Sequence, residues 1–145
     1  MPRELLANTV VPVADVDDAR GTARSFKQHV DGDSSDVTAV FVIEKGGGSL
    51  DPAPLEKMEM LAEEVLGAFE EEVGFEVDTE VLYGVNVADT IHEYALETDA
   101  DSILFQPREG GRWLRLITGD TAFSLITRNR VPVVSLPKKD SDGQG

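Results

Sequence analysis

Runs of apolar residues that suit strands alternate along the chain with stripes that suit helices, and this alternation allows few folds. Residues 37–43 form a nearly continuous β-branched run, which is typical of a strand buried on both faces. Residues 55–73 instead place apolar side chains three or four apart, as a helix does, and Gly74 follows as a helix end. Strands that alternate with helices form a parallel sheet with helices on both faces. The sequence therefore predicts a single α/β domain with an open parallel sheet.

The full alternation predicts five strands and four helices in the order β-α-β-α-β-α-β-α-β. The expected strands are residues 6–13, 37–43, 75–83, 102–105 and 131–136. The expected helices are residues 15–29, 52–73, 87–99 and 120–128, with Asp51 as the cap of the second. Residues 1–137 form the expected domain, and residues 138–145 are a polar tail.

Composition excludes several classes of function. Asp and Glu number 28 against 13 Lys and Arg, which gives a formal net charge of −15. Nucleic acids and anionic membrane surfaces are bound through clustered positive charge, so neither is an expected partner. Cys is absent, which excludes disulfides, Cys-ligated metals and thiol catalysis. Without a signal peptide or an apolar run of membrane-spanning length, we expect a cytoplasmic protein.

The acidic excess also suggests a saline environment. Only five of the 13 basic residues are Lys, and the carboxylates are many. In salt of about 1 M, repulsion between surface charges is screened over about 3 Å, so such a surface is tolerated there. The hypothesis is a halophilic source that accumulates salt.

Four segments resemble the universal stress protein family in their order and spacing. They are residues 8–13 (NTVVPV), 89–95 (DTIHEYA), 99–105 (DADSILF) and 131–137 (VPVVSLP). The resemblance implies a five-stranded sheet with strand order 3-2-1-4-5. In such a sheet ligands lie beyond the carboxyl ends of the strands, where the strand order reverses.

Nucleotide-binding members of that family carry the pattern G-x2-G-x9-G-[ST] after the fourth strand, because glycines let backbone N–H groups approach phosphate. Anchored on Gly119, the pattern falls on Gln106 and Glu109 in place of its first two glycines. Asp120 stands in place of the hydroxyl residue, and Thr121 follows one place later. A carboxylate about 4 Å from a phosphate charge repels it by about 4 kcal/mol at an effective dielectric constant of about 20.

The first strand departs from the family in the same direction. Members that bind ATP place an Asp two residues after the strand's Pro, whereas this chain has Ala14 there and Asp15 one step further on. Asp15 suits a helix cap instead. The candidate crevice residues are Val13, Ala14, Asp15, Val42, Gly110, Gly111, Arg112, Gly119 and Thr121.

Three functions are compatible with these residues. The leading hypothesis is a non-enzymatic universal-stress-type protein that acts in stress adaptation without a cofactor, its usual ATP-binding motif degraded. The alternative is a stress regulator that binds ATP or AMP in the same crevice. The third is a response-regulator receiver, with Asp17, Asp18 and Lys138 as its acidic pair and lysine, but the third strand ends without an Asp to accept a phosphoryl group.

Catalytic and metal sites are not expected. His29 and His92 fall on separate helices without the spacing of a metal pair, and no hydrolase, metalloprotease or P-loop motif occurs.

The fifth strand is the expected contact of a homodimer. In folds of the resembled family this strand pairs with its symmetry mate, which covers an exposed sheet edge. The residues expected at that contact are Val131, Val133, Val134 and Leu136. A regulatory protein partner is also expected, without a motif that identifies it.

Overall fold

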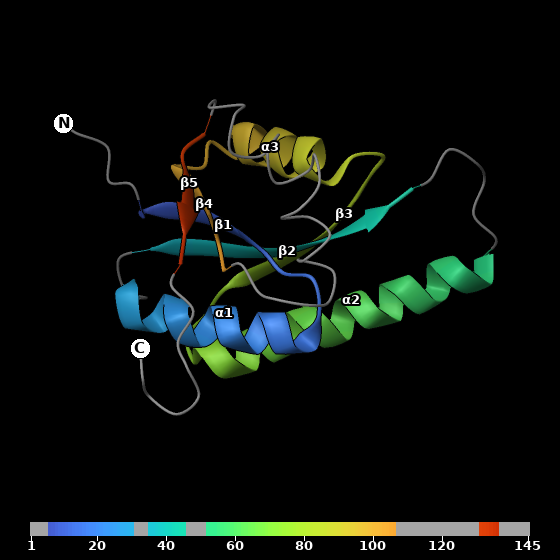
Figure 1. The fold of residues 1–145 in the computed structure, drawn as a ribbon, viewed down its shortest axis with the longest axis horizontal. Coiled ribbons are helices and arrows are strands. Elements are labelled where there is room, and N and C mark those ends of the chain that lie inside the picture. Colours follow the sequence, from blue (N-terminus) through green and yellow to red (C-terminus); the bar gives the residue numbers. More distant parts are fainter. Residues whose placement is uncertain (1–5, 31–34, 46–51, 107–130, 137–145) are drawn as a thin grey trace.

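The computed structural model describes residues 6–30, 35–45, 52–106 and 131–136, and within these the predicted alternation is confirmed (Figure 1). The strands are β1 (Asn8–Pro12), β2 (Asp36–Glu44), β3 (Asp78–Gly84), β4 (Ser102–Phe105) and β5 (Val133–Ser135). The helices are α1 (Val16–His29), α2 (Pro52–Val73) and α3 (Val87–Glu97). The expected helix at 120–128 and the cap Asp51 lie outside the described residues.

Three strands are shorter than the sequence predicts. The first was expected over 6–13, whereas β1 covers only Asn8–Pro12. The third was expected from residue 75, but pairing with β2 begins only at Asp78, which lies opposite Thr38. Phe75 and Val77 still pack against the core, so their alternation reflects burial and not strand pairing. The fifth was expected over 131–136, whereas its ladder with β4 is limited to Val133–Ser135.

All five strands are parallel, in the predicted order β3-β2-β1-β4-β5. β1 lies at the centre, with Val10 opposite Thr38 on β2 and opposite Ile103 on β4. The direction of winding therefore reverses between β1 and β4, and the carboxyl ends of these two strands mark the place where a ligand is expected.

Helices cover both faces of the sheet, α1 and α2 on one side and α3 on the other (Figure 1). Phe26 of α1 and Phe69 of α2 meet edge to face, with ring centroids 6.4 Å apart, over the first side. Ile91 of α3 packs with Val10 and Ile103 on the second. This two-sided burial explains why the residues of β1, β2 and β4 are mostly apolar.

Asp15 and Gly74 mark helix ends as the sequence predicts, and Asn86 is a further helix cap that was not predicted. The Asp15 carboxylate caps α1 by accepting a 2.7 Å hydrogen bond from the N–H of Asp18. Gly74, with a φ of 79°, ends α2 in the left-handed region that favours glycine. Asn86 caps α3 through a 2.9 Å bond from the N–H of Asp89.

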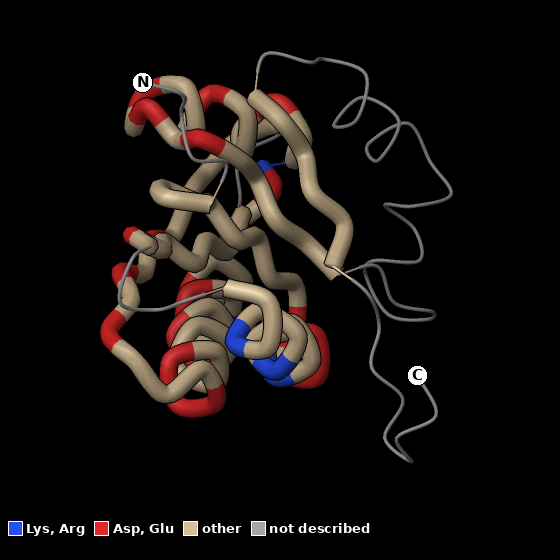
Figure 2. The backbone as a smooth tube through the Cα atoms, turned by 90° about the vertical axis from the view of Figure 1, so that its left-hand side faces the viewer, with Lys and Arg blue, Asp and Glu red and all other residues tan. Residues whose placement is uncertain are grey.

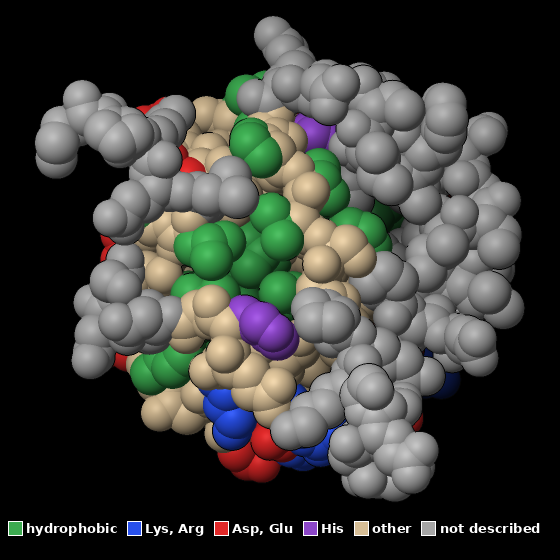
Figure 3. Space-filling view, turned by 60° about the vertical axis from the view of Figure 1, so that its left-hand side comes forward, with side chains coloured by type: hydrophobic (Ala, Val, Ile, Leu, Met, Phe, Trp, Pro, Cys, Tyr) green, Lys and Arg blue, Asp and Glu red, His purple; other side chains and the backbone are tan. Residues whose placement is uncertain are grey.

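Acidic residues predominate along the described chain, and basic ones gather on α1 (Figure 2). Within the described residues four ion pairs join α1 to the end of α2: Arg20 to Glu71 at 3.4 Å and to Glu72 at 3.6 Å, Arg24 to Glu72 at 3.4 Å, and Lys27 to Glu72 at 3.9 Å. Another face differs, with hydrophobic side chains gathered at its centre (Figure 3). Among the described helices, none combines the length and the apolar character needed to cross a membrane.

Candidate functional site

The place where the strand order reverses is closed by apolar side chains. Ala14 follows β1 and is 6% exposed, and it packs against Phe105, the last residue of β4. Val133, at the start of β5, lies against the same pair. The floor between β1 and β4 therefore offers carbon atoms and little polar surface.

Two carboxylates connect the end of β1 to the first turn of α1. Asp15 accepts from the N–H of Asp18, and Asp18 Oδ2 in turn accepts a 2.8 Å bond from the N–H of Ala14. Thr22 donates its hydroxyl to Asp18 Oδ1 at 3.3 Å. Asp18 is only 1% exposed. This reciprocal arrangement resembles a capping box, and it uses the backbone donor of Ala14 within the protein.

Gln106 lies just beyond β4, where the nucleotide-binding pattern has its first glycine. Its residue surface is 3% exposed, so a buried amide side chain stands where that pattern has none. A glycine at this place would let backbone approach phosphate. Gln106 is therefore a departure from the nucleotide-binding pattern that lies within the described residues.

The other described candidates, Val13 and Val42, do not share one surface. Val13 packs with the core beneath α1 and α2, whereas Val42 packs with the core beneath α3. Both are buried. The remaining candidates lie outside the described residues, namely Gly110, Gly111, Arg112, Gly119 and Thr121, together with Glu109 and Asp120.

Neither histidine belongs to a metal site within the described residues. His29 places Nδ1 at 2.8 Å from the carbonyl oxygen of Ser25 on its own helix, and His92 is buried on α3. In the same part of the chain, no group of three or more metal-ligating side chains comes together. Asp17 and Asp18, the acidic pair of the receiver hypothesis, lie inside α1 and not at the end of β1.

Within the described residues the expected dimer strand pairs on one side only, but two of its four expected contact residues do not lie at the surface of the protomer. Val131 and Leu136 are buried in the protomer's own core, one on each face of the sheet. Val133 and Val134 are half-buried, and Pro132 and Ser135 are exposed. The sequence pattern shows that these positions are apolar, which does not distinguish burial within one copy from burial between two.

In a comparison with known families, the family model described as "Universal stress protein family" matches residues 7–137 of this chain. The chain belongs to the universal stress protein family. This match confirms the resemblance seen in the four sequence segments. No curated protein matches the chain.

Solved structures of this family have the same fold. A universal stress protein from Archaeoglobus fulgidus in complex with dAMP is 20% identical, with a TM-score of 0.66 over 92% of this chain and 99% of that one. UspA from Lactobacillus plantarum is 21% identical, with a TM-score of 0.63 over 92% and 99%. A universal stress protein in complex with cAMP is 12% identical, with a TM-score of 0.63 over 92% and 98%.

Two residues at this site escaped the sequence reasoning. Asp18 was considered as one of the acidic pair of the receiver hypothesis and not as a buried acceptor, and Phe105 only as a strand residue. A usable signal for Asp18 was its position three residues after the cap Asp15, where a capping box places an acidic side chain. For Phe105 the signal was its position at the carboxyl end of the strand beside the reversal.

Proposed function

We propose that this protein is a non-enzymatic universal-stress-type protein that acts as a homodimer in stress adaptation and has lost the family's usual ATP site. The observation that carries the proposal is the hydrogen bond from the Ala14 N–H to the buried Asp18 carboxylate. In this bond the backbone N–H of Ala14 and the Asp18 carboxylate bind each other and not a ligand.

Freeing those groups for a ligand would be costly. If the Ala14 N–H turned to a nucleotide, the buried Asp18 carboxylate would lose a charge-assisted bond. Such bonds contribute about 1.5–3 kcal/mol. A nucleotide would have to supply that free energy before it gained any affinity.

The loop after β4 adds a second obstacle in the sequence. Glu109 and Asp120 replace a glycine and a hydroxyl residue of the nucleotide-binding pattern, and Gln106 replaces its first glycine. Carboxylates repel phosphate, and larger side chains keep backbone N–H groups from it. Both changes lower the affinity for ATP.

Titration calorimetry with ATP and AMP in molar KCl tests the loss of the site. The parent protein is expected to give no binding heat, and a variant with Glu109→Gly and Asp120→Ser is expected to bind ATP more tightly than the parent. The matched control neutralises two exposed acids on α3, Glu93→Gln with Glu97→Gln, and should leave ATP binding unchanged. Micromolar binding by the parent would overturn the proposal.

The homodimer is proposed to form along the free edge of β5. Within the described residues β5 pairs with β4 alone, and an open edge favours pairing with a second copy. Light scattering should give twice the 15.7 kDa of one chain. Ser135→Glu places like charges at this edge and should give the monomer, whereas Leu96→Glu, at an exposed position on α3, should leave the dimer intact. A monomeric parent would refute the contact.

A nucleotide-binding stress regulator is the second candidate. It is favoured by the two solved family members that hold dAMP and cAMP. The same titration separates the candidates, because this one requires saturable binding of ATP or AMP by the parent.

A further inference from the structure

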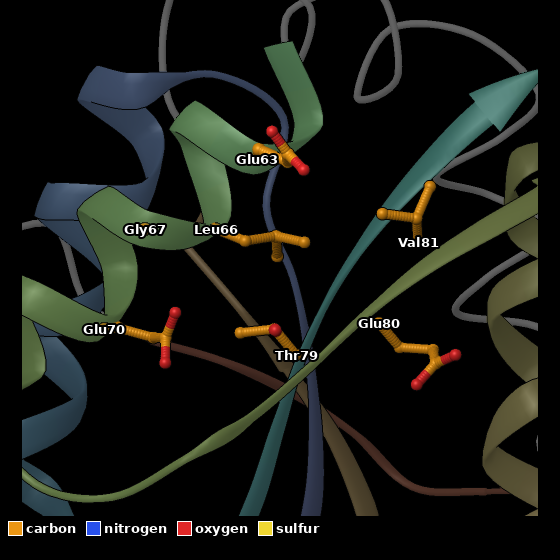
Figure 4. Close-up of a pocket in the computed structure, with 7 residues that line it drawn as sticks. All are labelled: Glu63, Leu66, Gly67, Glu70, Thr79, Glu80 and Val81. Atoms are coloured by element: carbon orange, nitrogen blue, oxygen red, sulfur yellow. The ribbon is translucent and has the colours of Figure 1, made fainter. Parts of the chain in front are cut away.

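A groove lies between α2 and the outer edge of β3, at the opposite side of the sheet from β5 (Figure 4). Its volume is about 210 Å³. The residues that line it are Glu63, Leu66, Gly67, Glu70, Thr79, Glu80 and Val81. Because β3 is separated from β4 by two strands, this groove is distinct from the crevice between β1 and β4.

The helix side of the groove is open at Gly67. A Cβ atom added to Gly67 would meet nothing within 4 Å, so no neighbouring group requires a glycine here. Glycine inside a helix costs about 0.5–1 kcal/mol relative to alanine. Leu66 and Val81 flank the opening and provide an apolar floor. The groove therefore has room for side chains from another molecule.

The strand side of the groove is an unpaired sheet edge. Within the described residues β3 pairs with β2 and with no other strand, so its outer backbone groups have no strand partner. Figure 4 shows the Thr79 side chain directed toward α2 and the Glu80 side chain directed away from it. Such an edge can accept an added strand through main-chain hydrogen bonds.

The charge of the groove is negative. Glu63 and Glu70 are exposed on the same side of α2, and none of the lining residues is basic. Within the described part of the chain these two acids form no ion pair, in contrast to Glu71 and Glu72, which pair with α1. Seven residues of helix separate Glu63 from Glu70 by about 10 Å.

We propose that this groove binds an extended, Lys- or Arg-bearing segment of a partner protein, which adds to β3 as a strand. In an added strand every second side chain faces α2, and these positions recur about every 7 Å. Long basic side chains at two such positions can reach Glu63 and Glu70, with their stems over Gly67 and Leu66. The opposite charge of the segment selects it, and the backbone of β3 holds it.

Fluorescence anisotropy with the full chain and a labelled peptide of alternating Lys and Val tests the proposal. Saturable binding is expected in moderate salt. Glu63→Gln with Glu70→Gln should weaken it about tenfold, the loss expected for two ion pairs. Glu93→Gln with Glu97→Gln on α3 makes the same charge change elsewhere and should alter the affinity less than about twofold.

Two substitutions of Gly67 test whether peptide binding needs the open space of the groove as well as its negative charge. Gly67→Leu fills the groove and should also weaken binding about tenfold, the loss that corresponds to about 1.4 kcal/mol. Gly67→Ala leaves most of the groove open and should bind as the parent does. Circular dichroism and thermal unfolding of both variants show whether the fold is kept.

Several results would overturn the proposal. These are an absence of saturable binding, equal weakening by the α3 control, or full binding by Gly67→Leu. A peptide methylated on its backbone nitrogens must bind more weakly, since equal binding would exclude strand addition. Displacement by spermine at equal charge concentration would indicate a simple cation site instead. Loss of a parent dimer in Gly67→Leu would assign the groove to a second copy of this chain.

Discussion

The Asp18 carboxylate, inside the first turn of α1, accepts a 2.8 Å hydrogen bond from the backbone N–H of Ala14 at the end of β1. The bond is buried, and Thr22 supports the same carboxylate from one turn further along the helix. It fixes the turn between β1 and α1. It also occupies a backbone donor at the end of β1, where the strand order reverses.

Removal of the Asp18 carboxylate should destabilise the fold. Asp18→Ala leaves the Ala14 N–H buried without this acceptor, which costs about 1–3 kcal/mol. Asp18→Asn keeps an acceptor oxygen and should cost less. Urea denaturation measures both, with Asp17→Ala at the exposed neighbouring position as the control. Equal stability of Asp18→Ala and Asp17→Ala would show that the bond contributes nothing.

Two glycines should respond to alanine in opposite directions. Gly67→Ala should raise the free energy of unfolding by about 0.5–1 kcal/mol, because its Cβ meets open space within a helix. Gly84→Ala should lower it by about 1–3 kcal/mol, because its Cβ would lie 1.9 Å from Thr90 Oγ1.

The overlap at Gly84 has an internal control. Thr90→Ala removes the Oγ1 atom, so the double variant should be more stable than the sum of the two single changes predicts. Additive losses in urea denaturation would show that this contact does not set the cost.

Salt should stabilise the protein. At low ionic strength the net charge of −15 opposes compaction, and raising salt to about 1 M shortens the screening length from about 10 Å at 0.1 M to about 3 Å. Salt also weakens the exposed pairs between α1 and α2, but each contributes only about 0–1 kcal/mol.

The melting temperature in low and in molar KCl measures this balance. We expect it to rise with KCl, and to rise less in Glu93→Gln with Glu97→Gln, which carries fewer acids. A melting temperature independent of KCl would argue against adaptation to salt.

The two tyrosines of the chain should ionise above the ordinary pKa of 10.0. A hydrogen bond to the Glu59 carboxylate, with burial and the charge of Glu59, raises the pKa of Tyr83. Burial and the charge of Glu80 raise the pKa of Tyr94, its bond with Thr38 opposes them, and the charge of Asp78 adds the weakest upward effect.

The sign of the pH effect follows from these raised values. The folded protein holds the phenol protons more tightly than the unfolded chain, so this stabilisation is complete below pH 10 and is lost as pH rises through the folded pKa values. The ultraviolet absorbance of tyrosinate measures both groups. Glu59→Gln should lower the pKa of Tyr83 and leave that of Tyr94 unchanged. Ionisation of both tyrosines at the ordinary pKa would contradict the contacts.

The fold could be predicted because its determinants are local and periodic. The continuous apolar run of β2 and the helical stripe of α2 each indicate burial, and Asp15 and Gly74 mark helix ends by their own chemistry. The strand order came from the resemblance to the family. The structure confirms it.

The site was harder to predict because it depends on which chain segments meet. Asp18 is buried and accepts a hydrogen bond from the backbone N–H of Ala14, and Gln106 is buried at the end of β4. The sequence shows that Leu136 is apolar, but only the packing shows that it is buried in the core of one protomer and not between two. The space over Gly67 likewise depends on how α2 and β3 are placed.

The Ala14 amide reports directly on whether a nucleotide reaches the end of β1. Its resonance can be followed in a nitrogen–proton NMR spectrum of the labelled protein in molar KCl as ATP is added. We predict that the signal stays in place and that the amide remains protected from hydrogen exchange, because Asp18 holds it. A saturable movement of the Ala14 signal with ATP, together with loss of that protection, would contradict the loss of the nucleotide site.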